Sequence, residues 1–219
     1  MFRKSSLIAF TMLLLTLLSC KDTIEQTAPE DKEVQVEKVY RPLVHHFGST
    51  GCSGCGRWGM PLVNRIADEM GDSVMPLITH FKYNDPFITP SSEALELAFL
   101  DAQYSPQVWF NSEDITFEII DLGLDNSIDE VKRRVRDSMS NEAKAYIGFQ
   151  ASINSNGRYD AEIVVQNNGD DSATYYVEIY TMENGPIASQ AGADPYVATH
   201  YRVNRGGFYG DMGKEIRLA

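Results

Sequence analysis

The chain has 219 residues and a net charge of −12, an acidic balance that excludes a protein holding nucleic acid through a basic surface. Hydrophobic residues make up 43% of the chain and aromatic residues 11%, which is enough to build a folded core. The length suits one large domain or two small ones.

Residues 1–19 have the pattern of a signal peptide. Arg3 and Lys4 precede an apolar run, 7–18, that is too short to cross a bilayer comfortably. The run ends in Leu-Leu-Ser-Cys, which resembles the bacterial lipobox, where a signal peptidase cuts before the cysteine and the cysteine is lipidated. We therefore expect Cys20 to carry a lipid anchor that holds the protein in the cell envelope, at the outer membrane. The alternative is an ordinary secretory signal that happens to contain a cysteine.

The sequence has three cysteines. With Cys20 assigned to the lipid, one pair remains, Cys52 and Cys55, in a Cys-x-x-Cys spacing. An exported protein lies in a compartment that permits disulfides, and two cysteines cannot form a four-cysteine metal cage. A redox dithiol, a metal-binding pair and a structural disulfide all remain open at this point.

Residues 20–38 are polar and charged, and they predict a flexible tether that is anchored by its lipid. The hydrophobic pattern and the turn-forming residues then predict the following elements. In chain order they are a strand at 41–47, a helix at 60–71, a strand at 73–81, a helix at 92–103, a strand at 107–111, a hairpin strand at 115–119 and a helix at 127–139 that starts with a Ser127–Glu130 capping box.

Residues 39–142 therefore form an α/β domain, with the two cysteines at the turn between its first strand and its first helix. Residues 143–219 change to strand patterns separated by the turn-forming stretches NSNG and NGDDS. We expect a smaller all-β, sandwich-like domain there. A truncated form of this domain is one expectation, because the sequence stops where a further strand or two is expected.

The order of elements in residues 39–142 resembles the thioredoxin fold. In thioredoxin-like proteins a cis-proline precedes the third strand and lies against the cysteine pair, and Pro106 in YSPQVWF occupies that place in the sequence. The stretches HHFGSTGCSGC, PLITHFKYNDPF and YSPQVWFN, together with the β-rich tail, also resemble the twenty-eight-kilodalton outer membrane protein-related lipoproteins of Bacteroidota. This resemblance implies a fold and a location more than it implies a reaction.

Three residues depart from the patterns of these families. Gly56 follows the second cysteine, where family members usually carry proline. Gly51 precedes the first cysteine, where thioredoxins often carry tryptophan. His46 replaces the buried acid that precedes the phenylalanine at the end of the first strand.

The predicted chemistry is thiol–disulfide exchange with thiols or disulfides of extracytoplasmic proteins, without an organic cofactor. Cys52 would lie at a helix N-terminus, where backbone N–H groups stabilise a thiolate, so it is the candidate nucleophile, and Cys55 is the resolving thiol. The thioredoxin resemblance implies that Pro106 presents backbone to a substrate. It also implies that His46 accepts a proton or adds positive charge; alternatively, His46 points into the core and bonds a carbonyl.

Two other functions remain open. Copper(I) favours two thiolates with an imidazole, and Cys52, Cys55 and His80 would supply them. A non-catalytic binding or structural lipoprotein would instead keep a permanent disulfide. The closed loop of a Cys-x-x-Cys disulfide is so small that it contributes little to stability, which weakens the structural interpretation.

Overall fold

The computed structural model describes residues 33–82, 84–100, 104–210 and 213–218. The expected signal peptide and Cys20 lie outside these ranges. Val34 packs with the rest of the chain and is buried, so the tether expected over 20–38 ends before this residue. In the described ranges, no helix combines the length and the apolar character that spanning a bilayer requires.

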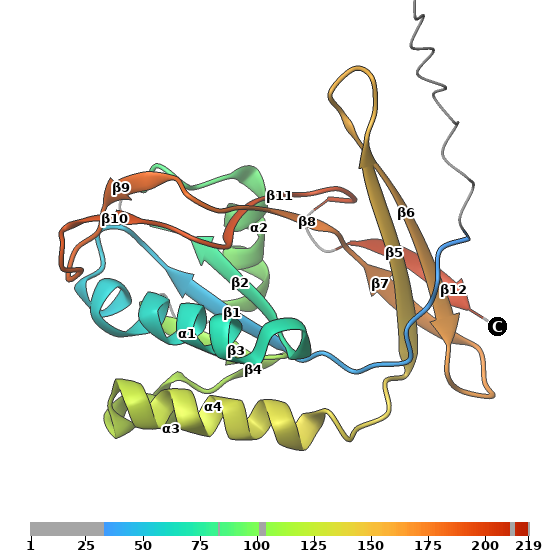
Figure 1. The fold of residues 1–219 in the computed structure, drawn as a ribbon, viewed down its shortest axis with the longest axis horizontal. Helices are drawn as coiled ribbons and strands as arrows, with labels where there is room; N and C mark the ends of the chain where they lie inside the picture. The colour runs from blue at the N-terminus through green and yellow to red at the C-terminus, as the bar shows by residue number, and fades with distance from the viewer. Residues whose placement is uncertain (1–32, 83, 101–103, 211–212, 219) are drawn as a thin grey trace, which may run out of the picture. The chain divides into compact units, whose positions relative to one another are not determined.

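The first region, up to Ser138, alternates strands and helices (Figure 1). Its elements are β1 (Leu43–Gly48), a π-helical turn η1 (Cys55–Gly59), α1 (Met60–Met70), a 3-10 turn η2 (Gly71–Ser73), β2 (Met75–His80), α2 (Pro90–Phe99), β3 (Gln107–Phe110), β4 (Glu113–Asp114), α3 (Thr116–Ile119), a 3-10 turn η3 (Ile120–Leu122) and α4 (Leu124–Ser138).

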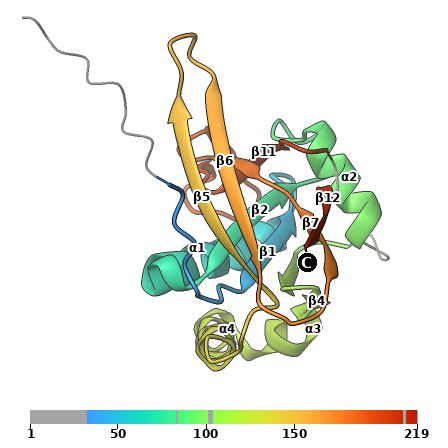
Figure 2. The ribbon, with the colours of Figure 1, turned by 90° about the vertical axis from the view of Figure 1, so that its right-hand side faces the viewer.

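The second region contains strands and their connections. They are β5 (Ala145–Ile153), β6 (Tyr159–Asn167), β7 (Ala173–Val177), β8 (Tyr180–Glu183), β9 (Ile187–Ser189), β10 (Val197–Thr199), β11 (Val203–Gly207) and β12 (Lys214–Leu218). The expected change from mixed α/β to β-rich structure is thus present, and Figure 2 shows β5 and β6 as a long hairpin.

The main sheet has six strands in the order β4-β3-β1-β2-β11-β8. β1 and β2 are parallel, and Gly48 lies opposite His80 at their carboxyl ends. The loop that carries the cysteines follows the carboxyl end of β1. Two strands of the β-rich region join the same sheet, because β11 pairs in parallel with β2 and β8 pairs antiparallel with β11. The remaining β-rich strands form three separate pairs rather than one sandwich of two continuous sheets.

Each face of the sheet has its own apolar core, because successive side chains of a strand point to opposite faces. On one face, Val44 of β1 packs with Leu62 and Ile66 of α1 and with Val131 of α4. On the other face, aromatic and aliphatic side chains gather between β1 and α2. They are Phe47, Phe81, Leu95 and Leu100.

The prediction of a strand at 115–119 is wrong. Thr116–Ile119 is a short helix, and the hairpin partner of β3 is the two-residue β4, which lies between the two predicted strands. Ile115 and Ile119 are both fully buried at a spacing of four, which is the helical period. The Asp114 side chain accepts the N–H of Thr116 at 2.9 Å and so satisfies a free donor at the start of the helix.

The predicted capping box at Ser127 is also wrong. α4 begins at Leu124, after Gly123 with a φ of 77°, so Ser127 lies inside the helix. Its hydroxyl is buried, lies 2.6 Å from the carbonyl oxygens of both Ile119 and Gly123, and donates its one hydrogen to this pair. A capping box does occur at α2, where Thr89 and Ser92 bond each other's backbone.

Candidate functional site

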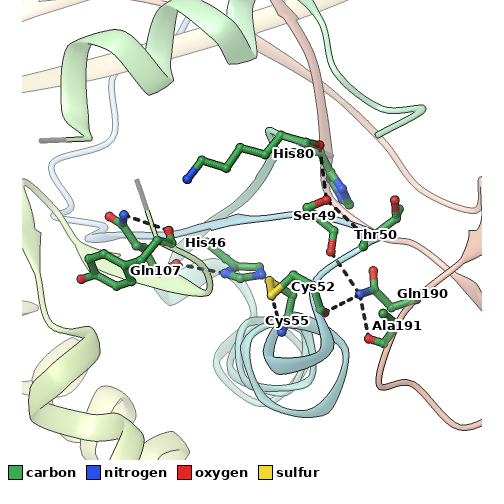
Figure 3. The surroundings of a disulfide bond; sticks show 12 residues. His46, Ser49, Thr50, Cys52, Cys55, His80, Gln107, Gln190 and Ala191 are labelled. Atoms are coloured by element: carbon green, nitrogen blue, oxygen red, sulfur yellow. Dashed lines mark hydrogen bonds between the residues drawn. A yellow bond between two sulfur atoms is a disulfide. The ribbon is translucent and has the colours of Figure 1, made fainter. Parts of the chain in front are cut away.

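Cys52 and Cys55 form a disulfide at the start of the helical segment that follows β1, with 5.2 Å between their Cα atoms (Figure 3). The N–H of Cys52 donates to the Ser49 carbonyl at 3.1 Å, which forms the turn. Cys52 is 8% exposed and Cys55 is fully buried, so Cys52 is the more accessible sulfur. The N–H of Cys55 donates to the Cys52 sulfur at 3.0 Å. Such a donor at a helix N-terminus would stabilise a thiolate at that sulfur.

The structure places Pro106 against this turn, directly before β3, and the Ser105–Pro106 peptide bond is cis. A Cβ added to Gly54 would lie 2.8 Å from the Pro106 ring. The glycine between the two cysteines therefore allows the proline to approach them closely.

His46 is fully buried beneath the cysteine turn. Its Nδ1 lies 2.9 Å from the carbonyl oxygen of Gln107. Because a carbonyl only accepts hydrogen bonds, Nδ1 carries the hydrogen and Nε2 carries the lone pair in the neutral ring. Nε2 has no hydrogen-bond partner among the described residues.

The edge of the His46 ring that carries Nε2 lies beside the Cys55 sulfur (Figure 3). A Cβ added to Gly48 would lie 2.4 Å from His46 Nε2 and 3.2 Å from Cys55 Sγ, so ring and sulfur border the same space. A Cβ on Gly59 would lie 2.5 Å from the ring. Glycines at 48 and 59 therefore make the room that the imidazole occupies.

Burial lowers the pKa of His46 to about 4, against the opposing effect of the Gln107 carbonyl and together with the charge of His80. His46 is therefore neutral at pH 7, and the expectation that it adds positive charge to the site is wrong. The expectations that His46 accepts a proton and that it bonds a carbonyl in the core are compatible, because one ring nitrogen bonds a carbonyl while the other faces Cys55.

His80 bonds the Asp85 carboxylate, with 2.9 Å between Nδ1 and Oδ2. The same carboxylate accepts the N–H of Thr50 at 2.5 Å and that of Phe87 at 2.9 Å. Burial alone would raise the pKa of Asp85, but the His80 bond and charge and the two amides hold it below its usual value. Asp85 thus fixes the loop that leads into Cys52.

The copper arrangement considered for Cys52, Cys55 and His80 is not assembled. In the described part of the chain, no three His, Cys, Asp or Glu side chains are grouped so that they could hold a metal ion. Beyond its bond to Asp85, the His80 ring contacts the rings of Phe87 and His200, whose centroids lie 5.0 and 5.4 Å away.

The sequence analysis missed the loop between β9 and β10, which packs on the cysteine turn. Gln190 in this loop is fully buried, and its Nε2 donates to the carbonyls of Ser49 and Cys52 at 3.1 Å each. Gly56 and Gly192 were the sequence signal for this contact, because both lie where the two loops touch. A Cβ at either position would lie 2.2 Å from a backbone oxygen of the other loop.

No family model matches this chain, and no curated protein matches it. A solved structure does match: HBP35 of Porphyromonas gingivalis, a thioredoxin-like protein of the Bacteroidota, with a TM-score of 0.57 and 17% sequence identity. The match covers 84% of this chain and 62% of HBP35, so this chain spans less than two thirds of its neighbour's length. At this identity the likeness concerns the fold alone. It supports a thioredoxin-like α/β region followed by a β-rich region.

Proposed function

We propose that this chain is a lipid-anchored envelope protein that exchanges thiols and disulfides through Cys52 and Cys55. The observation that carries the proposal is the environment of the Cys52 sulfur. The sulfur accepts a backbone N–H at the start of a helical segment, it is the more exposed sulfur of the pair, and Pro106 packs on its turn. This environment lowers the free energy of a Cys52 thiolate.

In the reducing direction, the Cys52 thiolate attacks one sulfur of a disulfide in an extracytoplasmic protein. A mixed disulfide forms, and the other substrate sulfur leaves as a thiolate that takes a proton from water. The Cys55 thiol then gives its proton to His46 Nε2 and attacks Cys52 Sγ. The second substrate sulfur leaves as a thiolate and takes up the proton that His46 held, so two electrons have passed to the substrate, His46 is neutral again and the Cys52–Cys55 disulfide has formed. The oxidising direction is the reverse.

His46 is placed for this proton transfer, and because burial lowers its pKa to about 4 it acts there as a weak base. Its Nε2 is unprotonated at pH 7, has no partner in the described structure and lies beside Cys55. A general base must be within reach of the proton that it takes, and its protonation state must be correct before it acts. The thioredoxin resemblance assigns Pro106, which packs against Gly54 of the turn, the role of presenting its neighbouring backbone to an extended substrate segment.

The low exposure of Cys52 favours a second candidate, a non-catalytic binding or structural lipoprotein with an inert disulfide. Only 8% of Cys52 is exposed, and the β9–β10 loop packs against the turn. In that case the disulfide would stay oxidised under any condition that the envelope offers.

The reduction potential of the Cys52–Cys55 pair separates the two candidates. It is measured by equilibrating residues 21–219 in glutathione and dithiothreitol buffers and trapping free thiols. A value between roughly −120 and −230 mV places the pair among exchange-competent oxidoreductases. A value below about −300 mV indicates a stable structural disulfide and contradicts the exchange function.

The lipid anchor at Cys20 is a separate proposal with its own test. The full chain, expressed in a Gram-negative host, is expected to incorporate a labelled fatty acid and to partition with the membranes. Cys20→Ala should lose both properties, whereas Cys52→Ser should keep both. A labelled Cys20→Ala protein would contradict the assignment.

A further inference from the structure

The β9–β10 loop contributes a buried side chain to the redox site. Gln190 is fully buried, and its Nε2 lies 3.1 Å from each of three carbonyl oxygens, those of Ser49, Cys52 and Ala191. Carbonyl oxygens only accept hydrogen bonds, so this contact set requires the nitrogen of the amide at that position and not its oxygen. The positive end of the Gln190 amide therefore faces the turn that carries Cys52.

Backbone contacts hold this side chain in place. The Ala191 N–H donates to the Thr50 carbonyl at 2.8 Å, which joins the loop to the turn directly. Gly192 has a φ of 80°, and a Cβ there would lie 2.2 Å from the Ser53 carbonyl oxygen. The loop and the cysteine turn approach closely, so the backbone that carries Gln190 is held beside Cys52.

The Cys52 carbonyl has two donors, the Gln190 amide and the N–H of Gly56 at 3.2 Å. A carbonyl oxygen carries partial negative charge, which repels a thiolate on the same residue. Donors to that oxygen reduce the repulsion, and the effect is larger in a buried site of low polarity. Reducing the disulfide creates that thiolate, so the Gln190 bond matters most in the reduced protein.

We propose that Gln190 is a positioning residue for the cysteine pair: through the carbonyls of Ser49 and Cys52 it fixes the turn and favours the thiolate form of Cys52. The inference adds a residue from the β-rich region to the site proposed above, and its biological meaning rests on that proposed function.

The test is the pH dependence of iodoacetamide alkylation of Cys52 in the reduced chain, residues 21–219, with the modified cysteine identified by mass spectrometry. Gln190→Leu keeps the size of the side chain and removes the donor. We expect its alkylation midpoint to rise by about half a pH unit or more, which means roughly three-fold less thiolate below the midpoint. Val197→Ala, in the exposed part of the same hairpin, should keep the wild-type midpoint.

A second measurement needs no variant. In the reduced wild-type protein, the side-chain amide resonances of Gln190 should shift with pH at the midpoint found for Cys52 alkylation. Equal alkylation midpoints in the wild type and in Gln190→Leu would overturn the inference. If the variant does not fold, the resonances decide: Gln190 resonances that do not shift at the Cys52 midpoint would overturn it too. Both readouts are taken on the reduced protein and require no disulfide exchange with a substrate, so failure of the exchange function and failure of the Gln190 role are distinguishable.

Discussion

The imidazole of His46 lies beside the sulfur of Cys55, and both residues are fully buried. Its unprotonated nitrogen borders the space that the ring shares with the sulfur, and its other nitrogen donates to the Gln107 carbonyl. A buried thiol resists ionisation, since burial penalises the charged form. A neutral imidazole in the same enclosed space can therefore take the proton that Cys55 must lose to become a thiolate.

Replacing His46 with asparagine tests this relationship. Asparagine can place its amide nitrogen near the position of Nδ1 and keep the bond to Gln107, but it has no basic group. We expect the resolving attack by Cys55 to slow on the order of 100-fold, the usual contribution of a general base. Stopped-flow decay of a Cys52 mixed disulfide measures this step. A variant that resolves at the wild-type rate would remove His46 from the mechanism.

Replacing each cysteine with serine should block a different step of disulfide exchange. Cys52→Ser removes the accessible nucleophile, so disulfide exchange with a glutathionylated peptide should be lost. Cys55→Ser keeps the first attack and removes the second, so a stable mixed disulfide should accumulate and be visible by mass spectrometry. Exchange that persists in Cys52→Ser would refute the assigned roles.

The buried histidines predict that the protein loses stability in mild acid. Burial lowers the pKa of His45 to about 3 and the pKa values of His46 and His200 to about 4. In the unfolded chain these groups take up protons near pH 6.5, so between pH 6.5 and 4 the unfolded state binds more protons than the folded state. The free energy of unfolding therefore falls as the pH falls, by about 2 kcal/mol per histidine between pH 7 and pH 5.

Urea denaturation at pH 7 and pH 5 measures this loss. His45→Gln gives a matched comparison, because a glutamine amide can replace the His45 Nε2 contact with the Thr79 hydroxyl, which is 2.8 Å in length, and does not titrate. The variant should show a smaller difference between the two pH values than the wild type. A wild-type stability that does not change between pH 7 and pH 5 would contradict the burial of these histidines as neutral groups.

The sequence was informative where one local pattern decided the structure. Met60–Met70 formed as a helix because Leu62 and Ile66 follow the helical period and pack into one core. The pattern failed at Thr116–Ile119, where four residues are too few for a helical period to be distinguished from a strand. It also failed at Ser127, since a serine that caps a helix and one that bonds the preceding turn from inside it look alike in sequence.

The site was predictable only in its local part. Cys52, Cys55 and Pro106 follow from a motif and a resemblance, and the structure brings them together. Gln190 lies 138 residues after Cys52, in a β-rich tail that supplied only a resemblance, and its position at the site depends on long-range contacts such as the pairing of β11 with β2. Long-range pairing of this kind leaves no periodic signal in a single sequence.

Gly56 provides a test of the contact between the two loops. A Cβ at position 56 would lie 2.2 Å from the Ala191 carbonyl oxygen and 2.8 Å from the Ala193 nitrogen. Both are backbone atoms, so relief requires the whole β9–β10 loop to move. We expect Gly56→Ala to lower the free energy of unfolding by about 1–3 kcal/mol, as overpacking does in a dense interior.

The matched control is Gly169→Ala in the second region, where a Cβ would make only ordinary contacts, the nearest at 3.8 Å. This change should leave the free energy of unfolding close to the wild-type value, which urea denaturation of both variants can compare directly. If the loop moves in Gly56→Ala, the Gln190 donor moves with it, so the alkylation midpoint of Cys52 should rise as it does in Gln190→Leu. A Gly56→Ala protein with wild-type stability and midpoint would mean that the loop does not rest on the cysteine turn in solution.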